Sequence, residues 1–213
     1  MNILVAGGSG LVGRAVLESA MHAECIDRVI ALLRRPHDRN DPKLETWLPV
    51  EGDLLTALRP QPVAAVICCL GTTIRKVGGD KAKFIHVDKD LVLGLARWAK
   101  QQGVRCFAVV SAIGADAKSC VFYNRVKGEM EEGLKAMGFP ELHIFQPSIL
   151  TGPRSEKRLG ERIGIAVMSA IAALLPDKYK PMPHDVLAKA MINCIGTPGG
   201  THASRSIRGL AGA

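Results

Sequence analysis

Short, nearly continuous apolar runs recur along the first 150 residues of the chain. They are rich in β-branched residues, and charged or glycine-containing segments separate them. Strands that are buried on both faces of a parallel sheet have this pattern, whereas half-exposed strands alternate apolar and polar residues. We therefore predict strands at residues 2–6, 28–33, 63–70, 105–111 and 141–147, with a weaker strand near 46–50.

Apolar residues between these runs recur at helical spacing. Helices are predicted over residues 11–21, 84–103 and 123–138, and the glycines that end the last two, Gly103 and Gly138, are typical helix-ending residues. Regular alternation of strand and helix indicates βαβ units with right-handed crossovers, which build a doubly wound parallel sheet. The predicted fold class is therefore α/β, in a single domain.

The chain after Pro153 follows a different pattern. Residues 163–176 are its most apolar late stretch, about fourteen residues long, whereas a helix that crosses a bilayer needs about twenty. We expect a buried helix there and no association with a membrane. Residues 154–213 would form a small C-terminal extension that closes a substrate pocket, and the small, polar tail after Gly196 is expected to be loosely packed.

The composition is that of one ordinary globular domain, since 47% of the 213 residues are hydrophobic and 23% are charged. The six cysteines include no Cys-x-x-Cys pair and no histidine at ligand spacing, so we expect small buried side chains and no metal site. The first residues do not resemble a secretory signal peptide. Together with the lack of a disulfide pattern, this favours a cytoplasmic protein.

The formal net charge of +8 raises the question of an anionic partner. Basic residues occur in short clusters, such as residues 34–39 and 75–83, and acidic residues interrupt them. Aromatic residues make up only 4% of the chain and do not interleave with these clusters, as a stacking surface for nucleic acid would require. The pattern favours a solvated basic surface or a small polyanionic ligand over nucleic acid.

The sequence GGSGLVG, from Gly7 to Gly13, joins the first predicted strand to the first predicted helix. Gly7 permits a sharp turn, Gly10 lets a pyrophosphate approach the backbone, and Gly13 lets the helix pack closely on the strand. The free N–H groups and positive dipole of the helix N-terminus would then bind phosphates. The pattern predicts a dinucleotide-binding Rossmann fold, and a tight turn without a ligand is the alternative.

Two arginines, Arg34 and Arg35, follow the second predicted strand at the point where NAD-binding folds often carry an acid. An acid accepts a hydrogen bond from the ribose 2′-hydroxyl and would repel a 2′-phosphate, whereas a guanidinium binds that phosphate with paired hydrogen bonds. Arg14, directly after Gly13, would assist. The sequence therefore favours NADP(H) over NAD(H), and two solvated arginines at a strand end are the alternative.

Eight segments, in the expected order, resemble the short-chain dehydrogenase/reductase superfamily. More closely, the chain resembles its atypical Tat-interacting-protein-like branch, which is related to NmrA-like and epimerase-type proteins. The segments are GGSGLVG (7–13), GDL (52–54), CCLGTT (68–73), VDKDLVLGLARWAKQQG (87–103), VVSAIGAD (109–116), YNRVKGEME (123–131), QPSILTGPR (146–154) and LLPDKYKPMPHDVLAKAM (174–191).

The resemblance implies roles for individual side chains. Ser111 would hydrogen-bond the substrate carbonyl. Tyr123 would donate a proton, and Lys127 would hold the nicotinamide ribose. Asp53 would accept a hydrogen bond from the adenine amine. Taken together, the glycine turn, the arginines and the resemblance predict this set of cofactor-binding residues: Gly7, Ser9, Gly10, Leu11, Val12, Gly13, Arg14, Arg34, Arg35, Asp53, Leu54, Leu70, Gly71, Thr72, Pro147, Ser148 and Ile149.

The spacing of Tyr123 and Lys127 has a physical reason. A phenol has a pKa of about 10, and each unit by which its pKa falls needs about 1.4 kcal/mol of preferential stabilisation. Residues four apart share one face of a helix, so the ammonium of Lys127 is expected to lower the pKa of Tyr123. Such a site would support hydride transfer to or from a small carbonyl or hydroxyl compound.

Two features leave other functions open. Tyr123 follows Ser111 by only twelve positions, and only sixty residues follow Pro153, where extended members of the superfamily have a larger lobe. The main alternative is a non-catalytic module that binds NADPH and presents a surface to a protein partner. A nucleotide-sugar epimerase or dehydratase is the third, and the short C-terminal region argues against it. Neither the substrate nor the oligomeric state follows from the sequence.

Overall fold

Seven parallel strands form one central sheet in the computed structural model, which describes residues 1–37, 40–153 and 180–212. Their order across the sheet is β3-β2-β1-β4-β5-β6-β9. Their bounds are β1 (Asn2–Ala6), β2 (Arg28–Leu32), β3 (Leu44–Trp47), β4 (Ala65–Cys68), β5 (Cys106–Val110), β6 (Glu141–Gln146) and β9 (Gly200–Ala203). The predicted α/β fold with a doubly wound parallel sheet is confirmed.

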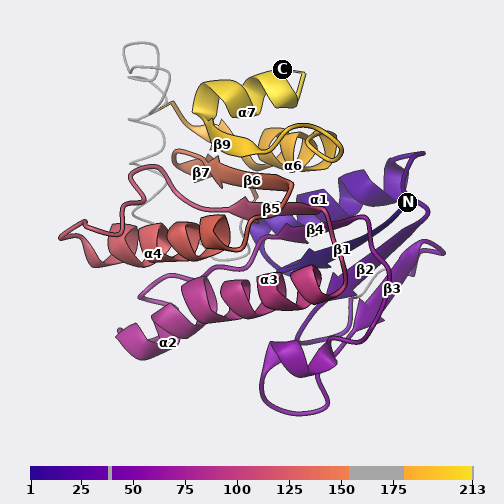
Figure 1. The fold of residues 1–213 in the computed structure, drawn as a ribbon, viewed down its shortest axis with the longest axis horizontal. Coiled ribbons are helices and arrows are strands. Elements are labelled where there is room, and N and C mark those ends of the chain that lie inside the picture. Colours follow the sequence, from indigo (N-terminus) through magenta and orange to yellow (C-terminus); the bar gives the residue numbers. More distant parts are fainter. Residues whose placement is uncertain (38–39, 154–179, 213) are drawn as a thin grey trace.

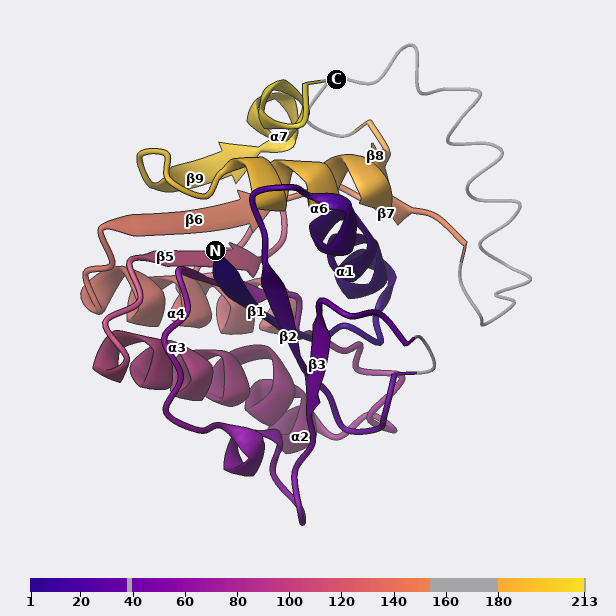
Figure 2. The same ribbon diagram turned by 90° about the vertical axis from the view of Figure 1, so that its right-hand side faces the viewer.

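Helices cover both faces of this sheet, as Figure 1 and Figure 2 show. On one face, α1 (Leu11–His22) packs against α6 (His184–Asn193), and α7 (Ser204–Leu210) packs against α6. On the other face, α3 (Leu91–Gln101) packs against α4 (Phe122–Ala136). The molecule therefore has three layers, with the sheet in the middle.

Alternate residues of the inner strands enter two separate hydrophobic cores. In β1, Ile3 and Val5 face the core that α1 and α6 cover, whereas Leu4 and Ala6 face the core beneath α3 and α4. All four of these side chains are fully buried. Burial on both faces explains why the strands appear in the sequence as continuous apolar runs.

The strands lie where the apolar runs predict them, within a few residues. The strand predicted near residues 46–50 lies earlier in the chain and spans Leu44–Trp47. It ends before Pro49, because proline has no N–H to donate to a sheet.

The helix predicted over residues 84–103 is interrupted. It consists of α2 (Lys81–Ile85), a π-helical turn η2 (His86–Asp90) and α3, and the Leu91 N–H donates to the His86 carbonyl at the end of the π turn. A π turn holds one residue more than an α turn, so it rotates the side chains that follow. Within it, Asp88 is turned into the protein and is buried.

The tail after Gly196 is not loosely packed, contrary to expectation. β9 pairs with β6 at the edge of the sheet, and Ile207 of α7 is fully buried. The small residues that suggested disorder instead permit close approach, because a Cβ on Gly199 would lie 2.7 Å from the Leu142 backbone nitrogen. In addition, the Arg208 guanidinium donates to the Pro181 carbonyl across 2.9 Å.

Part of the predicted C-terminal extension lies outside the described residues, including the apolar stretch 163–176. Its described part, residues 180–212, holds β8 (Met182–Pro183), α6, β9 and α7. β8 pairs with β7 (Leu150–Thr151) in a small separate sheet. No helix within the described ranges is long and apolar enough to cross a membrane.

All seven strands of the central sheet end at the same edge, because they are parallel and in register. Ala6 pairs with Leu32 of β2 and with Cys68 of β4, and Val110 of β5 pairs with Phe145 of β6. In doubly wound sheets, ligands bind outside this carboxyl edge where the strand order reverses, here between β1 and β4. Most of the predicted site residues follow these strand ends.

Candidate functional site

The glycine turn after β1 has the geometry that the sequence predicts. Gly7 has φ +83°, and the Gly10 N–H donates to the Gly7 carbonyl across 3.0 Å. A Cβ on Gly13 would lie 2.2 Å from that same carbonyl oxygen, so only glycine permits α1 to start so close to β1. Ser9 and Gly10 are exposed at the tip, whereas Leu11 is half-buried and Val12 is buried beneath it.

The N-terminus of α1 is suited to an anion. Its N-cap residue, Gly10, has no side chain to satisfy the first N–H groups, and its first turn holds no acidic residue. Arg14 in that turn is exposed. Phosphate groups bind at such helix ends because the N–H groups and the helix dipole both favour negative charge.

Arg34 and Arg35 are exposed just beyond the end of β2, which is the strand next to β1. Neither arginine makes an ion pair with another residue in the described part of the chain. No acid among those described residues neutralises their positive charge, and they lie at the same edge of the sheet as the glycine turn.

Asp53 and the turn after β4 complete the predicted nucleotide side of the site. Asp53 caps a short 3₁₀ helix, η1 (Leu54–Ala57), by accepting the Leu55 N–H across 2.9 Å. Its other carboxylate oxygen lies 3.9 Å from His86 Nε2, and Leu54 is buried. Leu70, Gly71 and Thr72 follow β4 and are half-buried or exposed.

A buried ion pair lies beneath the turn after β4. Lys127 Nζ of α4 is 2.8 Å from Asp88 Oδ1, and the side chains are only 4% and 1% exposed. The other Asp88 oxygen accepts the Thr72 N–H across 2.8 Å. A Cβ on Gly71 would lie 3.4 Å from Asp88 Oδ1, so the turn passes directly over the pair. Asp88 thus connects the π turn to α4 and to the turn after β4.

Tyr123 lies one helical turn before Lys127 and is 39% exposed, with its ring centroid 5.8 Å from that of Phe84. Burial raises the pKa of Tyr123 above its ordinary value more than the Lys127 ammonium lowers it, and the Asp88 carboxylate raises it further. The predicted lowering of the phenol pKa is therefore wrong. Burial of the phenol is the main reason, and the Asp88 carboxylate beside Lys127 adds to it.

The pKa of Lys127 is also raised. Burial alone would lower this pKa, but the Asp88 carboxylate outweighs the burial, and Tyr123 adds to the effect. Lys127 therefore keeps its positive charge inside the protein.

Ser111 is engaged with a second buried acid. Its hydroxyl donates to Glu131 Oε1 across 2.5 Å, and Ser111 and Glu131 are 4% and 3% exposed. Gln146 Nε2 donates to both Glu131 oxygens, at 2.9 and 3.1 Å, and Lys135 Nζ lies 3.7 Å from Oε2. The proton of Ser111 thus points to Glu131.

The residues after β6 are held by the backbone of their neighbours. The Pro147 carbonyl accepts the Ile113 N–H across 3.1 Å, and the Ile149 carbonyl accepts the Met182 N–H across 2.9 Å. The Ser148 hydroxyl donates to the Lys180 carbonyl across 2.5 Å. Pro147 and Ser148 are buried, whereas Ile149 is 53% exposed.

Sequence reasoning missed Asp88 and Glu131, although each carried a signal. Asp88 lies four residues after the buried Phe84 and four before the buried Val92, so it occupies an apolar-face position of its helix. Glu131 lies four residues after Lys127 on the inward face of α4. A charged residue on a buried face is unusual enough to indicate a partner.

Known proteins with similar sequences show the family of this chain. A family model described as NAD(P)H-binding matches residues 7–151. The chain belongs to this NAD(P)H-binding family. HTATIP2 of Rattus norvegicus is 31% identical over 208 residues, which cover 93% of this chain and 82% of that protein. FMP52 of Eremothecium gossypii is 35% identical over 167 residues, which cover 78% of this chain and 74% of that protein. The predicted Tat-interacting-protein-like branch is thereby confirmed.

Solved structures show the same fold. MoeE5 in complex with UDP-glucose and NAD has a TM-score of 0.70 at 13% identity and covers 97% of this chain and 79% of its own. The human epimerase family protein SDR39U1 with NADPH has a TM-score of 0.64 at 16% identity, and the match covers 94% of this chain and 72% of that chain. At these identities the likeness concerns the fold alone.

The predicted cytoplasmic location is contradicted. The FMP52 relatives of Eremothecium gossypii, Emericella nidulans and Aspergillus fumigatus are all named mitochondrial. The prediction used the lack of a secretory start and of a disulfide pattern. These features separate reducing from oxidising compartments, but mitochondrial targeting segments are amphipathic and arginine-rich, so they leave neither sign.

Proposed function

We propose that the protein is an NADP(H)-dependent oxidoreductase that transfers hydride reversibly to a small carbonyl compound or from the corresponding alcohol. The observation that carries this proposal is the buried ammonium of Lys127, held by Asp88 at the carboxyl edge of the sheet, one helical turn from the exposed phenol of Tyr123. Membership of the NAD(P)H-binding family supports the cofactor class.

The residues at the carboxyl edge fit a dinucleotide that carries a 2′-phosphate. The uncapped N-terminus of α1 and the close turn from Gly7 to Gly13 would bind the pyrophosphate. Arg34 and Arg35, with Arg14, would bind the 2′-phosphate, since guanidinium groups form paired hydrogen bonds with phosphate. When bound, the nicotinamide would supply or accept the hydride.

Tyr123 would supply the proton that turns the developing alkoxide into an alcohol. The raised pKa keeps the phenol protonated at neutral pH, which is the form that a proton donor needs. Once the proton has left, the phenolate would be stabilised by the Lys127 ammonium, whose own raised pKa keeps it charged. In the oxidation direction the same groups would act in reverse.

Ser111 would contribute less than Tyr123. Its proton is donated to Glu131, so it can donate to a substrate carbonyl only if that hydrogen bond opens. We therefore assign the main hydrogen bond on the substrate oxygen to Tyr123 and a secondary one to Ser111.

Turnover measurements test this assignment. Purified protein should oxidise NADPH in the presence of at least one member of a panel of small aldehydes and ketones. Tyr123→Phe should lower kcat by about 10²–10⁴-fold, as expected for the loss of a general acid, and leave the Kd for NADPH unchanged. Ser111→Ala should lower kcat less. Equal turnover by wild type and Tyr123→Phe would remove the catalytic role of the phenol.

A module that binds NADPH without turnover is the second candidate. One observation favours it, namely that the Ser111 hydroxyl donates its proton to Glu131. In that case NADPH would bind with the same dependence on Arg34 and Arg35. No member of the carbonyl panel would then be turned over, and Tyr123→Phe would change neither property.

A further inference from the structure

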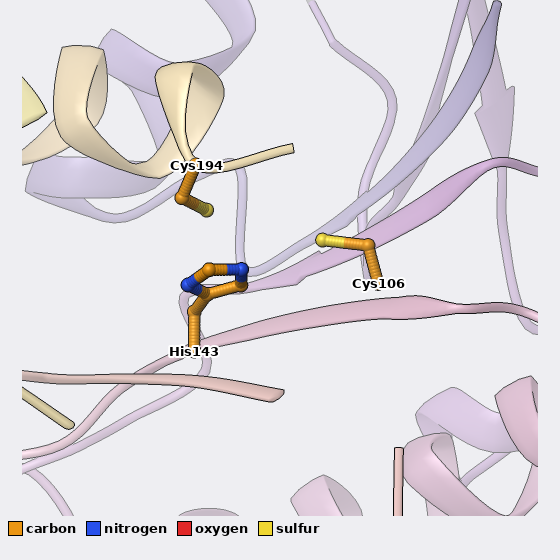
Figure 3. A group of neighbouring side chains, drawn as sticks. All are labelled: Cys106, His143 and Cys194. Carbon is orange, nitrogen blue, oxygen red and sulfur yellow. The ribbon is translucent and has the colours of Figure 1, made fainter. Parts of the chain in front are cut away.

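Two cysteines and a histidine meet on the α1 and α6 face of the sheet, away from the candidate cofactor site. Cys106 begins β5, His143 lies in β6, and Cys194 follows the last turn of α6. Their ligand atoms all lie within 4.8 Å of one another, and the three residues are at most 1% exposed. Figure 3 shows the two sulfur atoms and the imidazole pointing toward one another.

The three residues are distant in the sequence, which is why ligand spacing did not reveal them. β5 and β6 are neighbours in the sheet, with Ala108 opposite His143, so Cys106 and His143 lie close on one face. α6 packs on that face and brings Cys194 to them.

One nitrogen of His143 is oriented by a chain of hydrogen bonds. Its Nδ1 lies 3.0 Å from His202 Nε2, and His202 Nδ1 lies 3.2 Å from the Ser206 hydroxyl. If each Nδ1 carries the proton, His143 donates to His202 and His202 donates to Ser206. This arrangement leaves the lone pair of His143 on Nε2. Histidines that bind metals are commonly fixed in this way, with the other ring nitrogen donating to a partner.

The other nitrogen, Nε2, is buried and has no hydrogen-bond partner in the described part of the protein. The backbone of Thr197 lies beside the imidazole without completing a hydrogen bond to Nε2. Buried polar atoms are nearly always paired, so an unpaired one beside two thiols calls for an explanation. A metal ion bound by this nitrogen and the two sulfurs supplies one.

We propose that Cys106, His143 and Cys194 bind a zinc ion. Thiolate and imidazole are the ligands that zinc prefers, and a modest inward movement of the side chains from their present separation would bring them to about 2.3 Å (sulfur) and about 2.0 Å (nitrogen) from the ion. Two thiolates also cancel the charge of Zn²⁺, whereas Cu⁺ would leave a net negative charge in a buried site. A water molecule or the backbone of Thr197 would complete four ligands.

Binding would release protons. Zn²⁺ replaces the thiol protons of Cys106 and Cys194, so two protons leave for each ion bound while both thiols are protonated. Cys194 now donates to the Met191 carbonyl across 3.2 Å, a hydrogen bond that zinc binding would replace. Because protons are released on binding, zinc affinity should increase with pH.

The neighbouring carboxylate of Glu141 is already engaged and is not needed as a ligand. One of its oxygens accepts the Gly196 N–H across 3.1 Å, and the other lies 3.5 Å from Arg105 Nε. Glu141 and His202 are ionisable groups beside His143, and Arg105 pairs with Glu141. The ion would join β5, β6 and α6, and would thereby hold the segment after residue 180 onto the sheet.

Metal analysis of the full chain tests the proposal. Protein treated with chelator and reductant is dialysed against Zn²⁺, and we expect one zinc per chain by mass spectrometry of the metal. Co²⁺ in place of Zn²⁺ should give thiolate-to-cobalt charge-transfer bands and the intense visible bands of a tetrahedral site. NADPH should not change the stoichiometry.

Substitutions locate the ion. Cys106→Ser, Cys194→Ser and His143→Ala should each lower zinc affinity by at least tenfold. The matched control Cys25→Ser/Cys120→Ser changes two exposed cysteines and should bind one zinc as the wild type does. If the site variants do not fold, zinc should still protect Cys106 and Cys194 of the wild type from alkylation while Cys25 and Cys120 react.

Three outcomes would overturn the proposal. The reduced wild type does not bind zinc stoichiometrically, or the control variant loses zinc while the site variants keep it. Alternatively, Cys106 and Cys194 are found joined in a disulfide and the reduced protein takes up no zinc. Each outcome leaves the cofactor site unaffected, so the two proposals succeed or fail separately.

Discussion

Asp88 is the residue on which the candidate cofactor site most depends. One oxygen binds the Lys127 ammonium and the other accepts the Thr72 N–H, so a single carboxylate fixes a side chain of α4 and the turn after β4. Because both members of the pair are buried, removing one leaves an uncompensated charge in the protein. Such losses typically cost about 3–5 kcal/mol.

Asp88→Asn should therefore destabilise the protein by about 3–5 kcal/mol in urea unfolding, with the greatest loss near neutral pH. In the wild type the folded pKa of Lys127 is raised, so its contribution is complete below the unfolded pKa of about 10.4 and is lost only as pH rises through the folded value. In the variant the largest cause that raises the pKa of Lys127 is gone, so burial, the largest cause of all, lowers its folded pKa. The unfolded state then binds more protons, so stability should rise as pH approaches about 10.4.

The measurement is the difference in unfolding free energy between wild type and variant from pH 7 to 10. Asp90→Asn, which changes an exposed acid two residues away, is the matched control and should follow the wild type. A difference that stays constant with pH would show that Asp88 does not set the charge of Lys127.

Arg34 and Arg35 give a second prediction at the same scale. Replacing both with alanine should weaken NADPH binding by about 10- to 100-fold, since hydrogen bonds to charged groups contribute about 1.5–3 kcal/mol. NADH has no 2′-phosphate, so its affinity should change little. Calorimetric titration of both nucleotides measures the effect, with the exposed Arg97→Ala as control. Equal affinities of the wild type for NADPH and NADH would remove the reason for assigning these arginines to the phosphate.

Individual residues were predictable where local spacing decides their place. Gly7, Gly10 and Gly13 take their predicted places because a strand-to-helix turn follows from neighbouring residues. Asp88 and Glu131 were missed because each meets its partner across two separate elements, which the local pattern does not encode. The same holds for His143, whose partners come from α6 and β9.

At the scale of elements, β9 and α7 differ most from expectation. β9 runs along β6 from the His143–Gly200 pair to the Gln146–Ala203 pair. α7 then buries Ile207 and lies against α6, where Asn193 donates to the Leu210 carbonyl across 3.0 Å. Few apolar residues mark these elements, because an edge strand and a short helix each bury only one side.

Ile207→Ala tests whether α7 is packed as described. Removing a fully buried isoleucine side chain should cost about 2–5 kcal/mol, measured as a shift in urea unfolding. The exposed Arg205→Ala in the same helix should stay within about 0.5 kcal/mol of the wild type. Equal stability of the two variants would indicate that α7 does not pack on α6 in solution.

The interrupted helix at residues 81–101 shows what the spacing of apolar residues does not predict. Its helical period was predicted correctly, but the π turn at residues 86–90 adds a residue that composition does not signal. That turn places Asp88 against Lys127. π turns are often found at functional sites, and here the irregular element supplies the side chain that the regular pattern could not assign.

At the scale of the whole molecule, the class of fold followed from the sequence. Continuous apolar runs predicted parallel strands, and the glycine turn identified β1 as the first strand and α1 as the helix that follows it. The position of β9 did not follow from the sequence. More than fifty residues separate β9 from β6, and no local pattern shows that the two strands pair. The prediction of cellular location was wrong for a similar reason. Location depends on recognition by other molecules, and the features that were used do not report on it.

The order of strands in the sheet has a consequence for how the protein is made. β1 lies inside the sheet, and β4, β5, β6 and β9 are added beside it in the order in which they leave the ribosome. Each of these strands meets an edge that already exists, so the nascent chain can build this side outward without waiting for a distant partner. Until residues 200–203 emerge, however, β6 remains an open edge, and a stalled chain would offer that edge to other polypeptides.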